Sequence, residues 1–130
     1  MAKLVYQKEV KGFMDFDKAI AAHVGWKAKL RSYITHADKS LNPSVIEKDN
    51  LCTLGKWIYS EGLKYQANDF YIELVQDHAK FHKCAADIVR HIDAGNKKEA
   101  EAMIGANSEY SEISMEVVTK IRKLRGEIEK

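Results

Sequence analysis

The apolar positions of this chain follow helical spacing, most clearly between Phe70 and Ile92. The large apolar or aromatic residues there are Phe70, Tyr71, Leu74, Val75, Phe81, Ile88, Val89 and Ile92. This i, i+3, i+4, i+7 spacing predicts a helix with one buried stripe. His78 and His82 occupy positions in the stripe where two more apolar residues are expected. Histidines four residues apart lie about one turn from each other on one helix face, close enough to bind one metal ion.

A second long helix is predicted from about Phe13 to about Thr35. Its stripe contains Phe16, Ile20, His23, Leu30 and Ile34, with Trp26 at the border. His23 therefore takes a core-facing position, as His78 and His82 do on the later helix. Residues 1–11 are only lightly amphipathic, so we assign them no core role, and Gly12 is a candidate break.

The connection between these helices, residues 36–50, is predicted to contain little regular structure. Asn42 followed by Pro43 predicts a short helical turn that continues through Ile46. A dense apolar segment, residues 51–60, follows and is expected to form a short helix ended by Gly62. With Asp49 or Asn50 as N-cap, Cys52 is expected in the first helical turn, where the helix dipole favours a thiolate.

The remaining elements complete an all-α, four-helix-bundle-like fold. Asn68 or Asp69 is the expected N-cap of the central helix, and Gly95-Asn96 is its expected end. Asn96 to Glu99 resembles a capping box for a last helix that reaches about residue 128, with a bend or break at residues 105–107. We predict one domain over residues 1–130, with a core over about 13–118, three long helices and a short cysteine-bearing helix.

Composition narrows the functional classes. The chain has 130 residues, 45% of them hydrophobic and 31% charged, and a formal net charge of +2. This charge is too small to indicate nucleic acid or a membrane surface as a partner. We also find no apolar run long enough to span a membrane and no signal-peptide segment at the N-terminus. Two cysteines are too few for a disulfide framework, so we expect a reduced, cytoplasmic setting.

Four residues with metal-ligand chemistry are predicted to face one interior. They are His23, Cys52, His78 and His82, which we call the His3Cys set. Zinc takes four tetrahedral ligands from imidazole and thiolate, so the set matches Zn²⁺ in number and type. A site with one thiolate keeps a net positive charge, which a carboxylate such as Asp77 or Asp87 would moderate; the sequence leaves open which one.

The alternative interpretation is that these histidines are ordinary core residues. A single histidine on an apolar stripe is usually held by hydrogen bonds, but three of them together with a cysteine favour a metal site. His36, His91 and Cys84 serve as internal controls. Each points about 180° to 220° away from its nearest set member on a continuous helix, toward solvent or a flank. Trp26, Trp57, Tyr59 and the Phe70-Tyr71 pair are interpreted as packing residues.

Other cofactors and catalysis fit the sequence less well. A di-iron bundle requires paired Glu-x-x-His motifs, and a covalently attached haem requires Cys-x-x-Cys-His; the sequence contains neither. In a zincin, a glutamate would follow the first histidine, where this chain has Ala79. Four protein ligands also leave no open position on the metal for a reactive water, so we do not expect an enzyme.

Three short motifs resemble the chemoreceptor zinc-binding domain of bacteria. They are His23-Val-Gly-Trp26, Cys52-Thr-Leu-Gly55-Lys-Trp57 and His78-Ala-Lys-Phe-His82, and the likeness extends over about residues 13–118. The resemblance implies zinc bound by the His3Cys set, a homodimeric bundle and a sensory role in chemotaxis or cyclic-di-GMP signalling. It also implies a response to hypochlorous acid through oxidation of the zinc-bound Cys52.

Two functional hypotheses follow. In the first, the chain is a regulatory domain whose signal, zinc or an oxidant, acts through Cys52 on a signalling output domain or protein. In the second, zinc only stabilises a dimerisation or interaction module. No output domain of this family is present in the sequence, so we expect either a stand-alone member or a module of a longer receptor.

Overall fold

The computed structural model describes residues 14–129, and within that range every regular element is a helix. The elements are α2 (Phe16–Thr35), α3 (Pro43–Ile46), α4 (Thr53–Ile58), the 3-10 helix η1 (Glu61–Tyr65), α5 (Asp69–Asp93), α6 (Lys97–Met103) and α7 (Glu109–Ile128). The all-α prediction is confirmed. The expectations for residues 1–11 and Gly12 lie outside the described residues. No helix in the described range is both long and apolar enough to cross a membrane.

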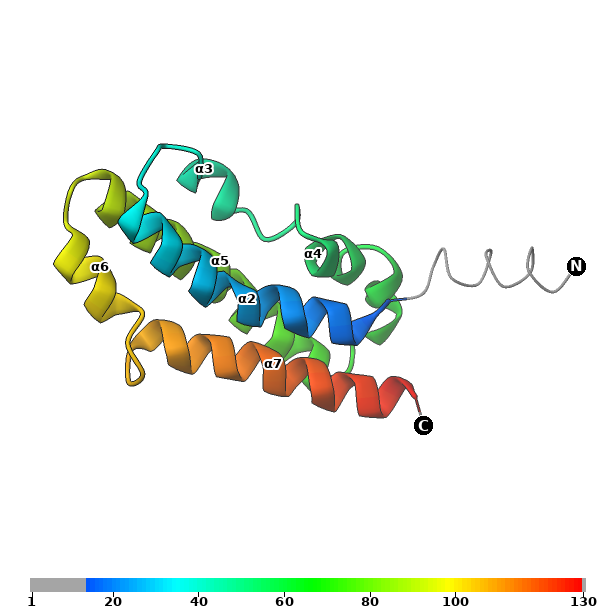
Figure 1. Ribbon diagram of the computed structural model, residues 1–130. Helices are drawn as coiled ribbons and strands as arrows, with labels where there is room; N and C mark the ends of the chain where they lie inside the picture. Colours follow the sequence, from blue (N-terminus) through cyan, green and yellow to red (C-terminus); the bar gives the residue numbers. More distant parts are fainter. Residues whose placement is uncertain (1–13, 130) are drawn as a thin grey trace, which may run out of the picture.

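Three long helices, α2, α5 and α7, lie side by side and form the body of the domain (Figure 1). α7 runs back along α2 and α5 in the opposite direction, and α6 connects α5 to α7 at one end. The short helices α3 and α4 belong to the chain that leads from α2 back to the start of α5, and α3 packs on α5. This arrangement brings the middle of α2, the middle of α5 and the start of α4 together.

Polar side chains set the starts of the long helices. Asp15 accepts a hydrogen bond from the Lys18 amide, and Asn68 accepts one from the Phe70 amide at 2.8 Å. Ser108 caps α7 in the same way. Each of these oxygens satisfies an amide that has no partner within the helix, so each fixes where its helix begins.

The core lies where the apolar stripes of the three long helices meet. Its fully buried side chains include Leu30 of α2, Leu74, Phe81 and Ile88 of α5, and Tyr110, Ile121 and Leu124 of α7. His23, His78 and His82 are the buried polar residues of the described range, with exposures of 3%, 0% and 5%. The prediction that these histidines face the core is therefore confirmed.

The cysteine-bearing helix differs from its prediction. Cys52 is the N-cap of α4 and not a residue of its first turn, and neither Asp49 nor Asn50 takes the cap position. α4 ends at Ile58, and Gly62 falls within η1. The sulfur itself accepts a hydrogen bond from the Gly55 amide at 3.3 Å, which moves the start of the helix to Thr53.

The C-terminal quarter of the chain forms two helices, with the break at the predicted glycine. α6 ends at Met103 and α7 begins at Glu109. Ser108 and Ser111 both donate their hydroxyls to the Gly105 carbonyl at 2.7 Å, which holds the turn. Asn96 does precede α6, but its side chain makes no capping hydrogen bond, so the predicted capping box is not formed.

Candidate metal centre

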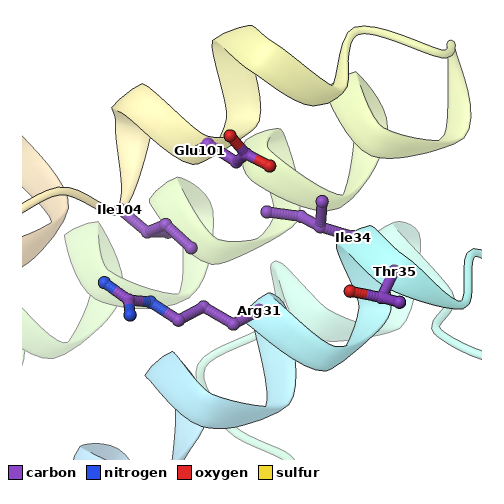
Figure 2. A pocket seen from close by; sticks show the side chains of 5 residues that line it. All are labelled: Arg31, Ile34, Thr35, Glu101 and Ile104. Atoms are coloured by element: carbon purple, nitrogen blue, oxygen red, sulfur yellow. The ribbon is translucent and has the colours of Figure 1, made fainter.

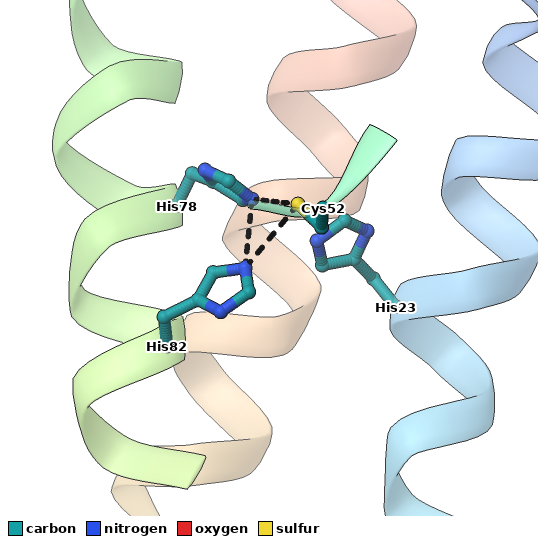
Figure 3. A group of neighbouring side chains, drawn as sticks. All are labelled: His23, Cys52, His78 and His82. Carbon is teal, nitrogen blue, oxygen red and sulfur yellow. Dashed lines mark hydrogen bonds between the residues drawn. The ribbon is translucent and has the colours of Figure 1, made fainter. Parts of the chain in front are cut away.

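The His3Cys set converges on one point between α2, α5 and the start of α4 (Figure 3). One potential ligand atom from each of its four residues lies within 4.8 Å of all the others. The Cys52 sulfur is 3.3 Å from Nε2 of His78 and 3.5 Å from Nε2 of His82. The two Nε2 atoms are 3.0 Å apart. Four residues from three separate elements therefore point their donor atoms at a common centre.

Backbone carbonyls fix the orientation of two of the imidazole rings. Nδ1 of His23 donates to the Ala19 carbonyl at 2.8 Å, and Nδ1 of His82 donates to the Ile46 carbonyl at 2.8 Å. A carbonyl oxygen can only accept, so the proton of each neutral ring lies on Nδ1 and the lone pair on Nε2. Outer hydrogen bonds of this kind orient histidines that ligate metals.

The third imidazole is held differently. Nε2 of His78 faces the sulfur and the His82 ring, and its Nδ1 is buried with no hydrogen-bonding partner. The ring is positioned by packing instead, since its centroid lies 4.5 Å from that of His82 and 5.1 Å from that of His23. A buried polar atom without a partner costs free energy. Burial of His78 is therefore unfavourable unless Nε2, its other nitrogen, makes a strong interaction.

The position of Cys52 depends on a close approach of the backbone at Gly55. A Cβ atom built on Gly55 would lie 1.8 Å from the Asp49 carbonyl oxygen, so only glycine fits there. The backbone of Asp49 and Asn50 thus packs against the first turn of α4, and the Gly55 amide donates to the sulfur. Gly55 thus sets the path of the chain that delivers Cys52 to the histidines.

The site favours uncharged groups when no metal is bound. Burial lowers the pKa of all three histidines, most strongly that of His78, which falls to about 2 with help from its His82 and His23 neighbours. Burial also raises the pKa of the Cys52 thiol, and the nearby amides of Gly55 and Leu54 offset this only in part. The expectation that the helix dipole favours a thiolate is therefore wrong for the metal-free protein, because desolvation outweighs the dipole of a six-residue helix.

The donor set fits zinc. Around a tetrahedral zinc with Zn–N bonds of about 2.0 to 2.1 Å, two nitrogen donors are separated by about 3.3 Å, and a sulfur is slightly farther from each nitrogen. The observed separations of 3.0, 3.3 and 3.5 Å follow this pattern. Three neutral imidazoles and one thiol are also donors of the types found in closed zinc sites. A cation here would be bound by Nε2 of His78, the nitrogen that faces the sulfur and the His82 ring.

The remaining histidines and the second cysteine lie apart from this centre. His36 is exposed just after α2, and His91 lies 3.7 Å from Glu99 near the end of α5. Cys84 is half-buried against the core, and burial raises its pKa to about 11. Trp57 packs edge-on to Phe16, as a packing residue should.

The carboxylates proposed to moderate the charge are engaged elsewhere. Asp77 accepts a hydrogen bond from Lys120 at 3.2 Å, and Asp87 pairs with Arg90 at 3.1 Å. The acid whose charge acts on the site is Asp49, which contributes to the pKa of both Cys52 and His82. Sequence reasoning missed this role because Asp49 lies in an irregular connection, where no periodicity indicates the direction of a side chain.

A groove of about 360 Å³ lies elsewhere, between α2 and α6 (Figure 2). Ile34 and Ile104 form its buried apolar floor, and Arg31, Thr35 and Glu101 line its exposed rim. It contains no member of the His3Cys set, and its polar side chains are open to solvent. The buried polar chemistry of the domain is concentrated at the metal centre.

Comparison with known families gives the same assignment. The model of the chemoreceptor zinc-binding domain family matches residues 23–89, more than half of the chain and a range that holds the entire His3Cys set. This protein belongs to the chemoreceptor zinc-binding domain family, whose members are zinc-binding sensory domains. Zinc is accordingly its cofactor. Comparisons with curated proteins and with solved structures gave no match.

Proposed function

We propose that this protein is a zinc-binding regulatory domain of bacterial signal transduction, in chemotaxis or cyclic-di-GMP signalling. In this proposal residues 1–130 form one domain, and His23, Cys52, His78 and His82 are the four zinc ligands. The family membership and the convergence of the four donors support this assignment. Four protein ligands complete a tetrahedral shell and leave no position for a reactive water, so we propose no enzymatic activity.

One observation supports the regulatory role: the four ligands differ in how deeply they are buried and in the length of the helix that holds them. The histidines are buried on the long helices α2 and α5, with exposures of 5% or less. Cys52 is half-buried, precedes a helix of six residues and follows an irregular connection. The sulfur is therefore the ligand that a small reagent can reach and the one whose backbone can move at least cost.

Bound zinc would keep Cys52 as a thiolate, the nucleophilic form of the side chain. We propose that hypochlorous acid is a signal. The sulfur attacks chlorine and displaces hydroxide, and the sulfenyl chloride is then hydrolysed, so that in sum thiolate and HOCl give sulfenic acid and chloride. Sulfur is oxidised by two electrons and chlorine is reduced by two. A sulfenic acid is a poorer zinc ligand than a thiolate, so oxidation releases the start of α4 from the histidines.

When Cys52 is released, we expect α4 and the connection before it to move. Leu54 and Ile58 anchor α4 in the core with exposures of 1% and 0%, so we expect a local displacement of residues 47–58. In the proposal, the domain is a homodimer in the cytoplasm, and this displacement changes the surface presented to an output domain or partner protein. The homodimer and the output partner are carried over from the resemblance to the family, and the cytoplasmic setting is carried over from the low cysteine count.

The test is the reaction of the zinc-loaded protein with hypochlorite at near-stoichiometric dose. We expect Cys52 to be modified before Cys84, as read by mass spectrometry of peptides after trapping of sulfenic acid. Burial raises the pKa of Cys84 to about 11, so this thiol is a matched, less reactive control within the same molecule. An unmodified Cys52 at this dose would remove the redox part of the proposal.

The second candidate is a structural zinc site in a dimerisation or interaction module. The buried histidines favour it, because a metal that satisfies them adds directly to folding free energy. Far-UV circular dichroism during titration with a chelator separates the two. A small, local loss of helix supports regulation, and global unfolding on zinc removal supports the structural role.

A further inference from the structure

An apolar groove of about 390 Å³ lies between α2 and α7, which run side by side (Figure 1). Its lining includes Val24 of α2 and Ser111, Met115 and Val118 of α7. Val24 is 56% exposed and Met115 is 67% exposed, the two highest values among the exposed large apolar side chains of residues 14–129. Scattered apolar residues on a surface need no explanation, but two that line the same groove indicate contact with a partner.

The groove belongs to a longer face, which we call the α2–α7 face. It consists of two stripes, Ala21, Val24 and Ala28 on α2 and Ser111, Met115 and Val118 on α7. Within each stripe the residues follow at steps of three and four, so they share one side of their helix. Residues 19–26 contain no lysine, arginine, aspartate or glutamate, although the outward side of α2 is exposed there. A helix side that lacks charges and is not covered is typical of the centre of a protein–protein contact.

Charged side chains flank the α2–α7 face at both ends. On α2, Asp17 precedes the stripe and Arg31 follows it, whereas on α7 the acid Glu112 lies near the start and Arg122 follows the stripe. Each of these side chains is exposed. Within the part of the chain that the structure describes, Arg31, Glu112 and Arg122 take part in no ion pair. These charges are therefore available to a partner.

A second copy of this chain matches these charges. Asp17 and Arg125 form an ion pair of 2.7 Å, which fixes the relative height of the antiparallel helices α2 and α7. Equal steps along both helices then place Arg31 at the height of residues 111–112. A twofold axis parallel to the long helices keeps these heights and lays α2 of one copy on α7 of the other. Arg31 then meets Glu112 of the second copy, and Asp17 lies within about one turn of Arg122 of the second copy.

The other twofold packing, in which α2 lies on α2, matches the charges less well. The second half of α2 carries only cations, Lys27, Lys29 and Arg31. The start of α2 carries charges of both signs, Asp15, Asp17 and Lys18, whereas the first half of α7 carries only acids, Glu109, Glu112 and Glu116. Charge complementarity therefore favours α2 on α7.

We propose that a second copy of this chain docks on the α2–α7 face, with α2 of each copy packed along α7 of the other. The inference deepens the homodimer of the proposed function, on which it rests, by assigning the surface where the two copies meet. Val24 and Met115 form the apolar centre of the contact, and the pairs of Arg31 with Glu112 set its register. Because the contact is twofold, each pair occurs twice.

The measurement is the dimer dissociation constant of the zinc-loaded protein, from sedimentation equilibrium over a series of concentrations. We expect Met115→Glu to raise this constant at least about tenfold, because it places a charge at the centre of the contact twice per dimer. Ile72→Glu is the matched control, since Ile72 is an apolar residue of α5 that is 42% exposed and lies outside the α2–α7 face. This variant should dimerise as the wild type does.

A charge exchange tests the register. Arg31→Glu and Glu112→Arg should each weaken the dimer, and the protein with both substitutions should regain wild-type affinity. If α2 lay on α2 instead, both new charges would face charges of their own sign, so the combined variant would be the weakest. Far-UV circular dichroism and zinc content of each variant show that it is folded and loaded.

A wild-type dimer that is unaffected by Met115→Glu would overturn the assignment of the face, as would a combined charge variant that is no tighter than either single one. A wild type that binds zinc but stays monomeric would overturn the dimer and leave the zinc-binding function intact. A folded wild type without zinc would instead contradict the proposed function.

Discussion

The Nδ1 atom of His82 donates a hydrogen bond of 2.8 Å to the backbone carbonyl of Ile46, the last residue of α3. This bond joins His82 to the connection between α2 and α4, thirty-six residues earlier in the sequence. Arg90, two turns farther along α5, binds Glu47 next to that carbonyl. The connection that carries Asp49 and Cys52 is therefore docked on the same helix that supplies two of the proposed ligands.

The carbonyl contacts predict the tautomers of two histidines. In the zinc-loaded protein, His23 and His82 should carry the ring proton on Nδ1 and use Nε2 as the metal donor, since Ala19 and Ile46 each accept from Nδ1. Long-range proton–nitrogen correlation spectra of a protein with labelled histidines measure this directly. A protonated Nε2 on either ring would show that the outer hydrogen bond does not fix the ligand atom.

The second prediction concerns Gly55. Gly55→Ala places a Cβ against the Asp49 carbonyl oxygen, so the chain before Cys52 must move. We expect a loss of roughly 1 to 3 kcal/mol in unfolding free energy, the range of overpacking substitutions, together with weaker zinc binding. Urea denaturation and chelator competition measure the two effects.

Gly126→Ala is the control for Gly55. Its Cβ would meet no atom within 4 Å, and it lies within α7. Alanine is favoured over glycine inside a helix by roughly 0.5 to 1 kcal/mol, so this variant should be slightly more stable, with unchanged zinc affinity. Equal behaviour of the two variants would contradict the close approach at Gly55.

The third prediction is a pH dependence of the metal-free protein. The pKa of each buried histidine is lower in the folded state than the ordinary value of 6.5, and that of His78 falls to about 2. Between these values the unfolded chain binds more protons than the folded one, so folding free energy is lost as pH falls below about 6.5. At neutral pH and above, both states are deprotonated and the effect vanishes.

Denaturation in urea at a series of pH values from neutral to acidic, with chelator present, measures this slope. Replacing His78 by phenylalanine removes one buried titrating group and should reduce the slope below pH 6.5. The exposed His36→Ala variant should retain it. A wild-type stability that is flat over this range would show that the histidines are accessible to protons in the folded state.

The long helices and the inward direction of the three histidines were predictable from the sequence because they depend on helical periodicity. Each histidine replaces an apolar residue in a continuous stripe, and a helix of twenty or more residues keeps that stripe in register. The Cys52 segment could be placed near them because its apolar residues must also reach the core. The break at Gly105 was visible because glycine and asparagine interrupt the pattern there.

The details of the site depend on individual contacts of side chains and backbone, which periodicity does not report. Cys52 caps its helix because its sulfur accepts from Gly55, and Gly55 admits the Asp49 backbone because it has no Cβ. The sequence offers the carboxylates of Asp77 and Asp87 as counter-charges, yet both have cationic partners. The expectation of a thiolate was wrong because helix position alone does not account for burial.

The most direct test of the zinc-site assignment is the metal content of the purified protein, measured by atomic spectroscopy after supplementation with zinc and removal of the excess. We predict one zinc per chain in the wild type, lost in Cys52→Ala and His78→Ala and retained in the control variants His36→Ala and Cys84→Ala. A folded wild-type protein that contains no zinc under these conditions would contradict the account.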